Sequence, residues 1–258
     1  MELALSFDSI ASTYNSTRTG YPDEIYDLAS KVGQLGPRSR ILEIGAGPGI
    51  ATQEIVDHLW CFMDIIEPGV SFCEILTSKF STNPKITIHN NTFEMFDSPQ
   101  QYDAIFSATA FHWVEPKVKY IKCNDLLSKN GILVLYWNNY LLVDHSVNEL
   151  AQVVYRKYFP NQDYSVSIYE IQEKKMRDRQ REILESEFFT LQESRVFKQL
   201  VQFPLAKYID LLRTFSENVV LEKSVSEQFF AEISMCVGGG SATVEVEILT
   251  NMEIARKI

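Results

Sequence analysis

The pattern of hydrophobic and polar positions predicts short buried strands that alternate with amphipathic helices in the first half of the chain. Five apolar runs are expected to be strands, at residues 41–44, 61–67, 85–89, 102–107 and 132–137. Between them apolar residues recur at helical spacing, as at Ile25, Leu28 and Val32. Strands that alternate with helices in this way predict an α/β fold with a parallel sheet.

The pattern changes after residue 137. An amphipathic helix is expected around Val147, Val154 and Tyr158, and the charged run at 168–185 is typical of a solvated helix face. Residues 138–186 are therefore predicted to form a helical insertion after the fifth strand. The elements expected after it are a strand, two helices, a glycine turn and a last segment, at 194–203, 207–216, 222–235, 238–240 and 243–256. We expect one domain over 1–258, with an N-terminal flap and helix at 1–33.

Composition narrows the class of protein. The chain is 45% apolar and 22% charged, as in soluble globular proteins, and its net charge is −10 without a basic cluster. This balance disfavours a nucleic-acid partner. The N-terminus has no secretory pattern and no apolar run is long enough to span a membrane, so we expect a cytoplasmic protein without a membrane partner. The four cysteines and four histidines are scattered, so no metal site is expected.

A glycine-dense turn follows the first predicted strand. It places Gly45, Gly47 and Gly49 directly before a helical pattern. Strand, glycine turn and helix form the opening unit of doubly wound α/β sheets, where the unpaired N–H groups of the helix start attract polar ligand groups. The commonest dinucleotide motif, G-x-G-x-x-G, needs a third glycine one residue later, and that position is Ile50. A nicotinamide oxidoreductase is therefore the weaker of the nucleotide-fold hypotheses.

An acidic residue closes the second predicted strand. Glu67 follows Gly49 by 18 residues, which is where nucleotide folds place a ribose-binding acid. A carboxylate can accept hydrogen bonds from both ribose hydroxyls. The alternative is an ordinary surface carboxylate at the end of a strand.

Five segments, FDSIASTYNSTRTGYP, LEIGAGPG, DIIEP, YDAIFSATAFHWV and NGILVLYWNN, together resemble the class I S-adenosylmethionine-dependent methyltransferases. The chain is similar to the small-molecule group that includes the ubiquinone/menaquinone-biosynthesis and trans-aconitate methyltransferases. The resemblance implies a doubly wound, Rossmann-like, seven-stranded, mostly parallel sheet with its last strand antiparallel. It also implies S-adenosylmethionine as cofactor, S-adenosylhomocysteine as product and a small-molecule methyl acceptor.

The resemblance further implies a cofactor site drawn from several segments: Tyr14, Arg18, Glu43, Gly45, Ala46, Gly47, Glu67, Pro68, Thr92, Phe93, Ser107 and Ala108. The glycine turn would cradle the methionine part, and Glu43 would orient that turn or meet the cofactor's amino group. Glu67 would hold the ribose, with Pro68 against the adenine. Thr92 stands where many members carry an acid, so Phe93 would contribute a backbone N–H instead.

The remaining cofactor residues come from the fourth strand and the N-terminal segment. Ser107 and Ala108 would line the cofactor at the strand end, while Tyr14 and Arg18 would close over it. The guanidinium of Arg18 can pair with the cofactor's carboxylate.

The loop after the fourth strand supplies a candidate catalytic base, His112, because ligands of open α/β sheets bind at the carboxyl ends of the strands. A structural histidine packed on Trp113 is the alternative. The candidate pocket walls are aromatic: Phe111, Trp113, Trp137, Tyr140 and Phe215. The sequence favours methyl transfer to a small molecule, with the N-terminal segment and residues 138–186 as a lid. A non-catalytic cofactor-binding or assembly protein on the same fold is the alternative of another class.

Overall fold

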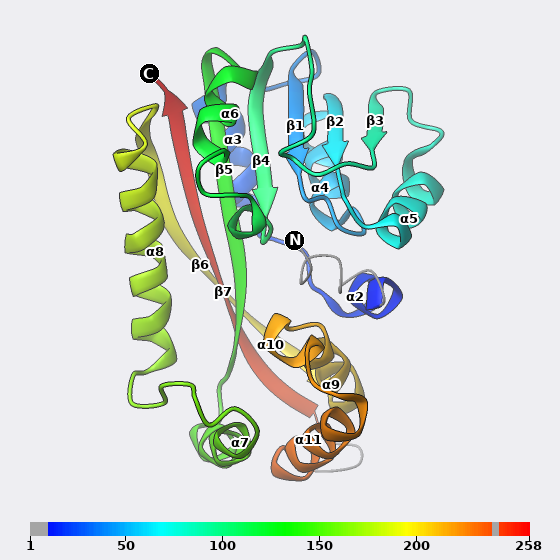
Figure 1. The fold of residues 1–258 in the computed structure, drawn as a ribbon, viewed down its shortest axis with the longest axis vertical. Coiled ribbons are helices and arrows are strands. Elements are labelled where there is room, and N and C mark those ends of the chain that lie inside the picture. The colour runs from blue at the N-terminus through cyan, green and yellow to red at the C-terminus, as the bar shows by residue number, and fades with distance from the viewer. Residues whose placement is uncertain (1–9, 239–242) are drawn as a thin grey trace.

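The computed structural model describes residues 10–238 and 243–258, and its centre is one seven-stranded sheet (Figure 1). The strand order is β3-β2-β1-β4-β5-β7-β6, and β7 runs antiparallel to both of its neighbours. This confirms the expected mostly parallel sheet with an antiparallel last strand. The strands are β1 Arg40–Ile44, β2 Phe62–Ile66, β3 Ile86–His89, β4 Tyr102–Ala108, β5 Leu127–Leu142, β6 Phe189–Pro204 and β7 Thr243–Lys257.

In the described part of the chain two helices precede β1, and the others lie in the connections between strands. The helices are α2 Ala11–Thr17, α3 Glu24–Gly33, α4 Ile50–Leu59, α5 Val70–Phe80, α6 Lys119–Leu126, α7 His145–Tyr158, α8 Ile168–Glu185, α9 Leu205–Arg213, α10 Ser216–Val219 and α11 Lys223–Cys236. A short 3-10 helix, η2 Phe111–Trp113, follows β4. No helix in 10–238 or 243–258 combines the length and apolar character needed to cross a bilayer.

The two faces of the sheet build two hydrophobic cores. Alternate strand residues point to opposite faces, so Ile41 joins one core and Leu42 the other. Helices α3, α4 and α5 cover the first face, where Ile55 and Leu76 are fully buried. Helix α6 and the end of α8, through Ile183, cover the second. Burial on both faces explains why the central strands are continuous apolar runs.

Strands β5, β6 and β7 extend well beyond the rest of the sheet (Figure 1). The pairing of β4 with β5 ends at Ala108 opposite Tyr136, whereas β5 stays paired with β7 as far as Leu142 opposite Val246. The extension leaves the sheet at the carboxyl ends of the parallel strands. A third core joins its far end to α7, α9 and α11. Helices are thus held over the edge at which such sheets bind ligands.

A buried asparagine joins this extension to the N-terminal segment. Asn138 on β5 accepts a hydrogen bond from the Thr250 hydroxyl of β7 at 2.6 Å, and its amide donates to the carbonyl of Gly20 at 3.0 Å. Its side chain is only 8% exposed, so these partners replace the water that it loses. The same N-terminal segment is fixed to α4, because the Tyr21 N–H donates to the carboxylate of Glu54.

Several predicted boundaries differ from the structure. The fifth strand was expected to end at residue 137, but β5 continues to Leu142, so the insertion begins after the expected residue 138, with its helices α7 and α8 at 145–185. Gly131 lies within β5, next to a break in the register with β4. Of the predicted glycine turn, residues 239–240 lie outside the described residues. The helices predicted at 168–185 and 222–235 are confirmed.

Candidate functional site

The glycine turn between β1 and α4 has the backbone conformation that its sequence predicts. The φ angles of Gly45, Gly47 and Gly49 are 70°, 54° and 81°, values that residues other than glycine rarely adopt. A Cβ at Gly49 would also lie 2.6 Å from Phe80 and 2.7 Å from Leu76, so the turn packs tightly against α5. At Gly47 a Cβ would meet nothing within 4 Å. The turn is therefore anchored on one side and open on the other.

The carboxylate of Glu67 forms a hydrogen bond with the backbone of this turn on its open side. Its carboxylate accepts the N–H of Gly47 at 2.8 Å through one oxygen and the N–H of Gly69 at 2.8 Å through the other. The side chain is 6% exposed and lies at the carboxyl end of β2. Asn90, after β3, donates to the carbonyls of Glu67 and Pro68 at 3.0 Å and fixes the backbone beside the carboxylate. A polar, preorganised corner thus forms where two neighbouring strands end.

A cleft of about 770 Å³ runs along these strand ends. Most of the residues expected to bind a cofactor line it: Tyr14, Arg18, Gly45, Gly47, Glu67, Pro68, Thr92, Phe93 and Ala108. Ala46 lines only a small adjoining cavity of about 30 Å³. Ile66, Phe72 and Thr109 also line the cleft and were not anticipated. The available signal was their position within two residues of a predicted strand end, for Ile66 and Thr109, or in the next helix, for Phe72.

Two of the expected residues stand behind the cleft. Ser107 is fully buried and donates to the carbonyl of Ile44 at 2.9 Å. Glu43 is 1% exposed, accepts the hydroxyl of Thr52 at 2.6 Å and has its second oxygen unpaired among the described residues. Burial raises the pKa of Glu43 to about 7. Neither lines the cleft or the small cavity beside it, so both can support the glycine turn from β1 and β4.

Arg18 lies where the cleft meets the helices of the third core. Its Nε donates to the hydroxyl of Thr214 and its Nη2 to the carbonyl of the same residue, both at 2.8 Å. The guanidinium also lies 4.9 Å from the ring centroids of Tyr14 and Phe215 and 5.5 Å from that of Tyr140. Arg18 thus links the segment after α2 to the turn after α9. Its expected pairing with a cofactor carboxylate stays a prediction.

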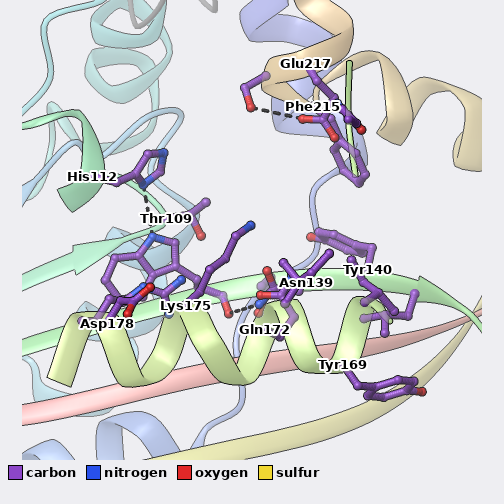
Figure 2. A pocket seen from close by; sticks show the side chains of 18 of the residues that line it. Thr109, His112, Asn139, Tyr140, Tyr169, Gln172, Lys175, Asp178, Phe215 and Glu217 are labelled. Atoms are coloured by element: carbon purple, nitrogen blue, oxygen red, sulfur yellow. Dashed lines mark hydrogen bonds between the residues drawn. The ribbon is translucent and has the colours of Figure 1, made fainter. Parts of the chain in front are cut away.

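A second cavity, of about 820 Å³, adjoins the cleft (Figure 2). Its walls come from the extension of β5, from α7 and α8, and from the α9–α10 region. Six residues line both cavities: Arg18, Thr109, His112, Val114, Pro116 and Ser216. The expected aromatic walls also divide between them, because Trp113 lines the first cavity while Phe111, Trp137, Tyr140 and Phe215 line the second. Two ligands can therefore approach one another at a shared boundary.

His112 lies on this boundary, and its hydrogen bond restricts its chemistry. The indole Nε1–H of Trp137 donates to Nδ1 of His112 at 3.2 Å. Burial, with smaller effects from the nearby cations Arg179 and Lys175, lowers the pKa of His112 to about 4. A neutral ring that accepts at Nδ1 carries its proton on Nε2, so it can donate a hydrogen bond from Nε2 but has no free lone pair there. This geometry favours a donor over a general base.

Helix α8 contributes polar residues that the sequence reading did not anticipate. Its charge run was interpreted as a solvated face, but Gln172, Lys175 and Arg179 line the second cavity. Their spacing of three and four residues places them on one face of the helix, and this was the only signal for them in the sequence. No cluster of histidine, cysteine or acidic side chains in the described segments could hold a metal ion.

The sheet order and the glycine turn define a Rossmann-like α/β protein with its ligand site at the carboxyl ends of the strands. A sequence model of the family "Ribosomal RNA adenine dimethylase" matches residues 23–128. The chain is 30% identical over 154 residues to a Dictyostelium discoideum protein named as a methyltransferase, covering 59% of this chain and 56% of that protein. It is 28% identical over 178 residues to the Saccharomyces cerevisiae protein CRG1, named as an S-adenosylmethionine-dependent methyltransferase, covering 66% and 57%.

Solved structures agree on the fold. A protein from Anaeromyxobacter dehalogenans that is named as a type II methyltransferase superposes with a TM-score of 0.66 at 14% identity, over 93% of this chain and 97% of that one. A protein from Galdieria sulphuraria that is named as a sarcosine dimethylglycine methyltransferase gives 0.53 at 16% identity, over 91% and 84%. The chain thus has the fold of the class I S-adenosylmethionine-dependent methyltransferases, as its sequence segments indicated. Its alignments span just over half the length of the two curated relatives described above.

The hydrogen bond at His112 generates a prediction for its titration. In ¹⁵N NMR spectra we expect His112 to remain a neutral Nε2–H tautomer from pH 8 to about 5, because its pKa is about 4. An unfolded histidine titrates near 6.5, so this residue lowers the stability of the fold as pH falls from about 6.5 towards 4. Trp137→Phe should free Nδ1 and remove this tautomer preference. A wild-type His112 that titrates near 6.5 would contradict the assignment.

The contacts of Glu67 generate a second prediction. Glu67→Ala should weaken binding of S-adenosylhomocysteine by about 1.5–3 kcal/mol, because a charged acceptor for ribose hydroxyls and for the Gly47 N–H is lost. Calorimetric titration measures this directly. Glu74→Ala, which removes the same charge from an exposed position on α5, is the matched control and should bind normally. Unchanged affinity in Glu67→Ala would show that the ribose binds elsewhere.

Proposed function

We propose that this protein transfers a methyl group from S-adenosylmethionine to a small-molecule acceptor. The observation that carries the proposal is the pair of large cavities that share Arg18, Thr109 and His112. One cavity contains the glycine turn and Glu67, and the other has an aromatic and apolar wall. A cofactor in the first and an acceptor in the second would meet at the shared residues.

The residues of the cleft fit this cofactor. The open side of Gly47 allows close approach to the backbone, and Glu67 can accept from ribose hydroxyls. Ile66 and Phe93 provide apolar contacts at the end of the cleft beside Asn91 and Thr92, where an adenine ring would lie. When bound, S-adenosylmethionine supplies an electrophilic methyl group on a sulfonium, and the protein supplies alignment and exclusion of water.

The acceptor's proton need not be taken by His112. In the geometry described above, the Nε2–H of His112 can donate a hydrogen bond that orients an acceptor oxygen at the boundary. An acceptor that is already an anion needs no base, whereas a phenol or carbon acid would need one. His112 therefore acts in this proposal as an orienting donor, and its earlier assignment as a base is the alternative that the NMR titration distinguishes.

An RNA acceptor is the second candidate, because the matching family is named for ribosomal RNA adenine dimethylation. The match ends at residue 128, at the start of β5, so it covers the cofactor half and leaves out α7, α8 and α9. These helices form much of the second cavity. A net charge of −10 also opposes binding to a polyanion. Both observations support a small-molecule acceptor.

Turnover and binding test the proposal. S-adenosylmethionine and S-adenosylhomocysteine should raise the melting temperature in a concentration-dependent way, and NAD should not. A panel of small organic acceptors should release S-adenosylhomocysteine, while total RNA should not increase that release. Stabilisation by the cofactor without turnover of any acceptor would support a non-catalytic binding protein. Equal stabilisation by NAD would contradict the cofactor assignment.

We also propose that α8 and the N-terminal segment act as a lid over the acceptor. Helix α8 buries only Gln172 and Ile183 among its residues, and Ile183 lies near its carboxyl end in the second core. The amino-terminal part of α8 therefore has few apolar anchors and can open locally. Such closure would keep water from the reacting methyl group. A fixed cover for the sheet edge is the alternative.

Amide hydrogen exchange distinguishes the lid from a fixed cover. Saturation with S-adenosylhomocysteine should slow exchange at residues 10–21 and 160–185, because the lid closes on the occupied site. Helix α11, which buries Phe229 and Ile233 away from the cleft, serves as the internal control. Protection confined to residues 43–50 and 65–69 would leave the cofactor site intact and remove the lid.

A further inference from the structure

Two cations on the inner face of α8 have no acidic partner. Lys175 and Arg179 are four residues apart and both line the second cavity. Among residues 10–238 and 243–258 neither forms a hydrogen bond or an ion pair, and Nη1 of Arg179 is buried without a partner. The neighbouring cations of the same helix are paired, by contrast: Lys174 pairs with Asp178, which also lines the cavity, and Arg177 pairs with Glu173. The unpaired cations are therefore confined to the cavity side.

The positions of these cations are electrostatically unfavourable without an anion. Burial lowers the pKa of both Lys175 and Arg179, and their mutual repulsion lowers the pKa of Lys175 further. Like charges four residues apart on a helix destabilise it. A ligand anion between the two would remove the repulsion and satisfy the buried Nη1.

The surrounding acids do not neutralise them by contact. Glu182, on the next turn of α8, is already paired with Lys119. Glu217 faces Lys175 only at a distance, where it raises the pKa of the lysine slightly against the larger effects of burial and Arg179. The carboxyl group of Glu253 is buried on β7 and has no hydrogen-bond partner among the described residues, and burial raises its pKa to about 7. A carboxyl group that is partly protonated at neutral pH compensates Arg179 incompletely.

From this arrangement we infer that Lys175 and Arg179 form a subsite for a carboxylate of the acceptor, which specifies the substrate class of the proposed function. The planar guanidinium of Arg179 suits the two oxygens of a carboxylate. The aromatic rings of Tyr140 and Phe215 line the same cavity and suit an apolar body. Gln172, which is 6% exposed, has an unpaired amide oxygen there, so the acceptor also carries a hydroxyl or amine donor.

Trp137 separates this subsite from the reacting centre. The guanidinium of Arg179 lies 3.8 Å from the ring centroid of Trp137, and the indole Nε1 of the same ring donates to His112. Figure 2 shows His112 and Lys175 at different places along the cavity. An acceptor held by its carboxylate at Arg179 therefore presents a different atom to the methyl group at His112. The subsite selects organic acids that are methylated away from the bound carboxylate.

A matched pair of probes tests the subsite in the protein saturated with S-adenosylhomocysteine. We expect 3-phenylpropionate to bind at least about tenfold more tightly than its uncharged amide in calorimetric titrations. Lys175→Gln and Arg179→Gln should each weaken the acid by about tenfold and leave the amide unchanged. Arg177→Gln, on the outer face, is the control and should not alter either affinity. Although its environment is partly desolvated, the Lys175 side chain remains exposed to solvent, so Lys175→Gln should leave the fold intact.

Other results of these titrations would contradict either the subsite or the proposed function. Equal affinity for acid and amide, or no binding of either up to ~10 mM, would overturn the subsite, as would an equal loss in Arg177→Gln. If S-adenosylhomocysteine binds and the acid does not, the subsite fails and the proposed function stands. The same titrations on the protein without S-adenosylhomocysteine separate the two claims further: if the acid binds through Lys175 and Arg179 there but S-adenosylhomocysteine itself does not bind, the subsite stands and the proposed function fails.

Discussion

The continuous pairing of β5 with β7 beyond the end of β4 is the constraint on which the rest of the site depends. Ladder pairing from Ile132 opposite Arg256 to Leu142 opposite Val246 makes a long, rigid extension of the sheet. Because β5 is parallel to β4, this extension leaves the sheet at the edge where ligands of open α/β sheets bind. The third core then fixes α7, α9 and α11 on the extension. Without it the cofactor cleft would face water and no second cavity would adjoin it.

Burial of polar groups around that cavity gives the site its chemical character. Asn138 is fully partnered, and it ties the N-terminal segment to the extension through Gly20. Burial and its bond to Trp137 keep His112 neutral. The guanidinium of Arg179 contacts the face of Trp137, and its buried Nη1 has no hydrogen-bond partner in the described part of the chain. Electrostatic interactions are strong in a cavity of low dielectric constant. An acceptor that binds Arg179 is therefore also oriented for a hydrogen bond with His112.

The features that depend on residues close together in the chain could be predicted from the sequence. The glycine motif after the first strand indicated a turn with positive φ angles, and three glycines adopt them. The distance from that motif to Glu67 indicated the acid at the end of β2. The course of β5 could not be predicted, because Asn138 and Asn139 resemble the residues that end a strand. Only the partners from β7 and the N-terminal segment make the amide of Asn138 acceptable inside a sheet. Long-range pairing overrode local preference there.

The acceptor side was harder to predict for a related reason. A charged helix such as α8 is usually solvated, and nothing local distinguishes its inner cations from its outer ones. The distinction depends on Lys119 from α6, which engages Glu182, and on the cavity that the β5 extension creates. The cofactor side is built from contiguous motifs, whereas the acceptor side is built from α7, α8 and α9, which meet only in the folded protein.

The position of the transferred methyl group tests the central claim most directly. With S-adenosylmethionine labelled with ¹³C in its methyl group, we expect nuclear Overhauser contacts from that methyl to the side chains of Thr109 and His112. These two residues line both cavities. The adenine protons should contact Phe93 at the other end of the cleft. A methyl group that instead contacts Ile66 or Phe93, with none to Thr109 or His112, would contradict the claim that the two cavities meet at the reacting centre.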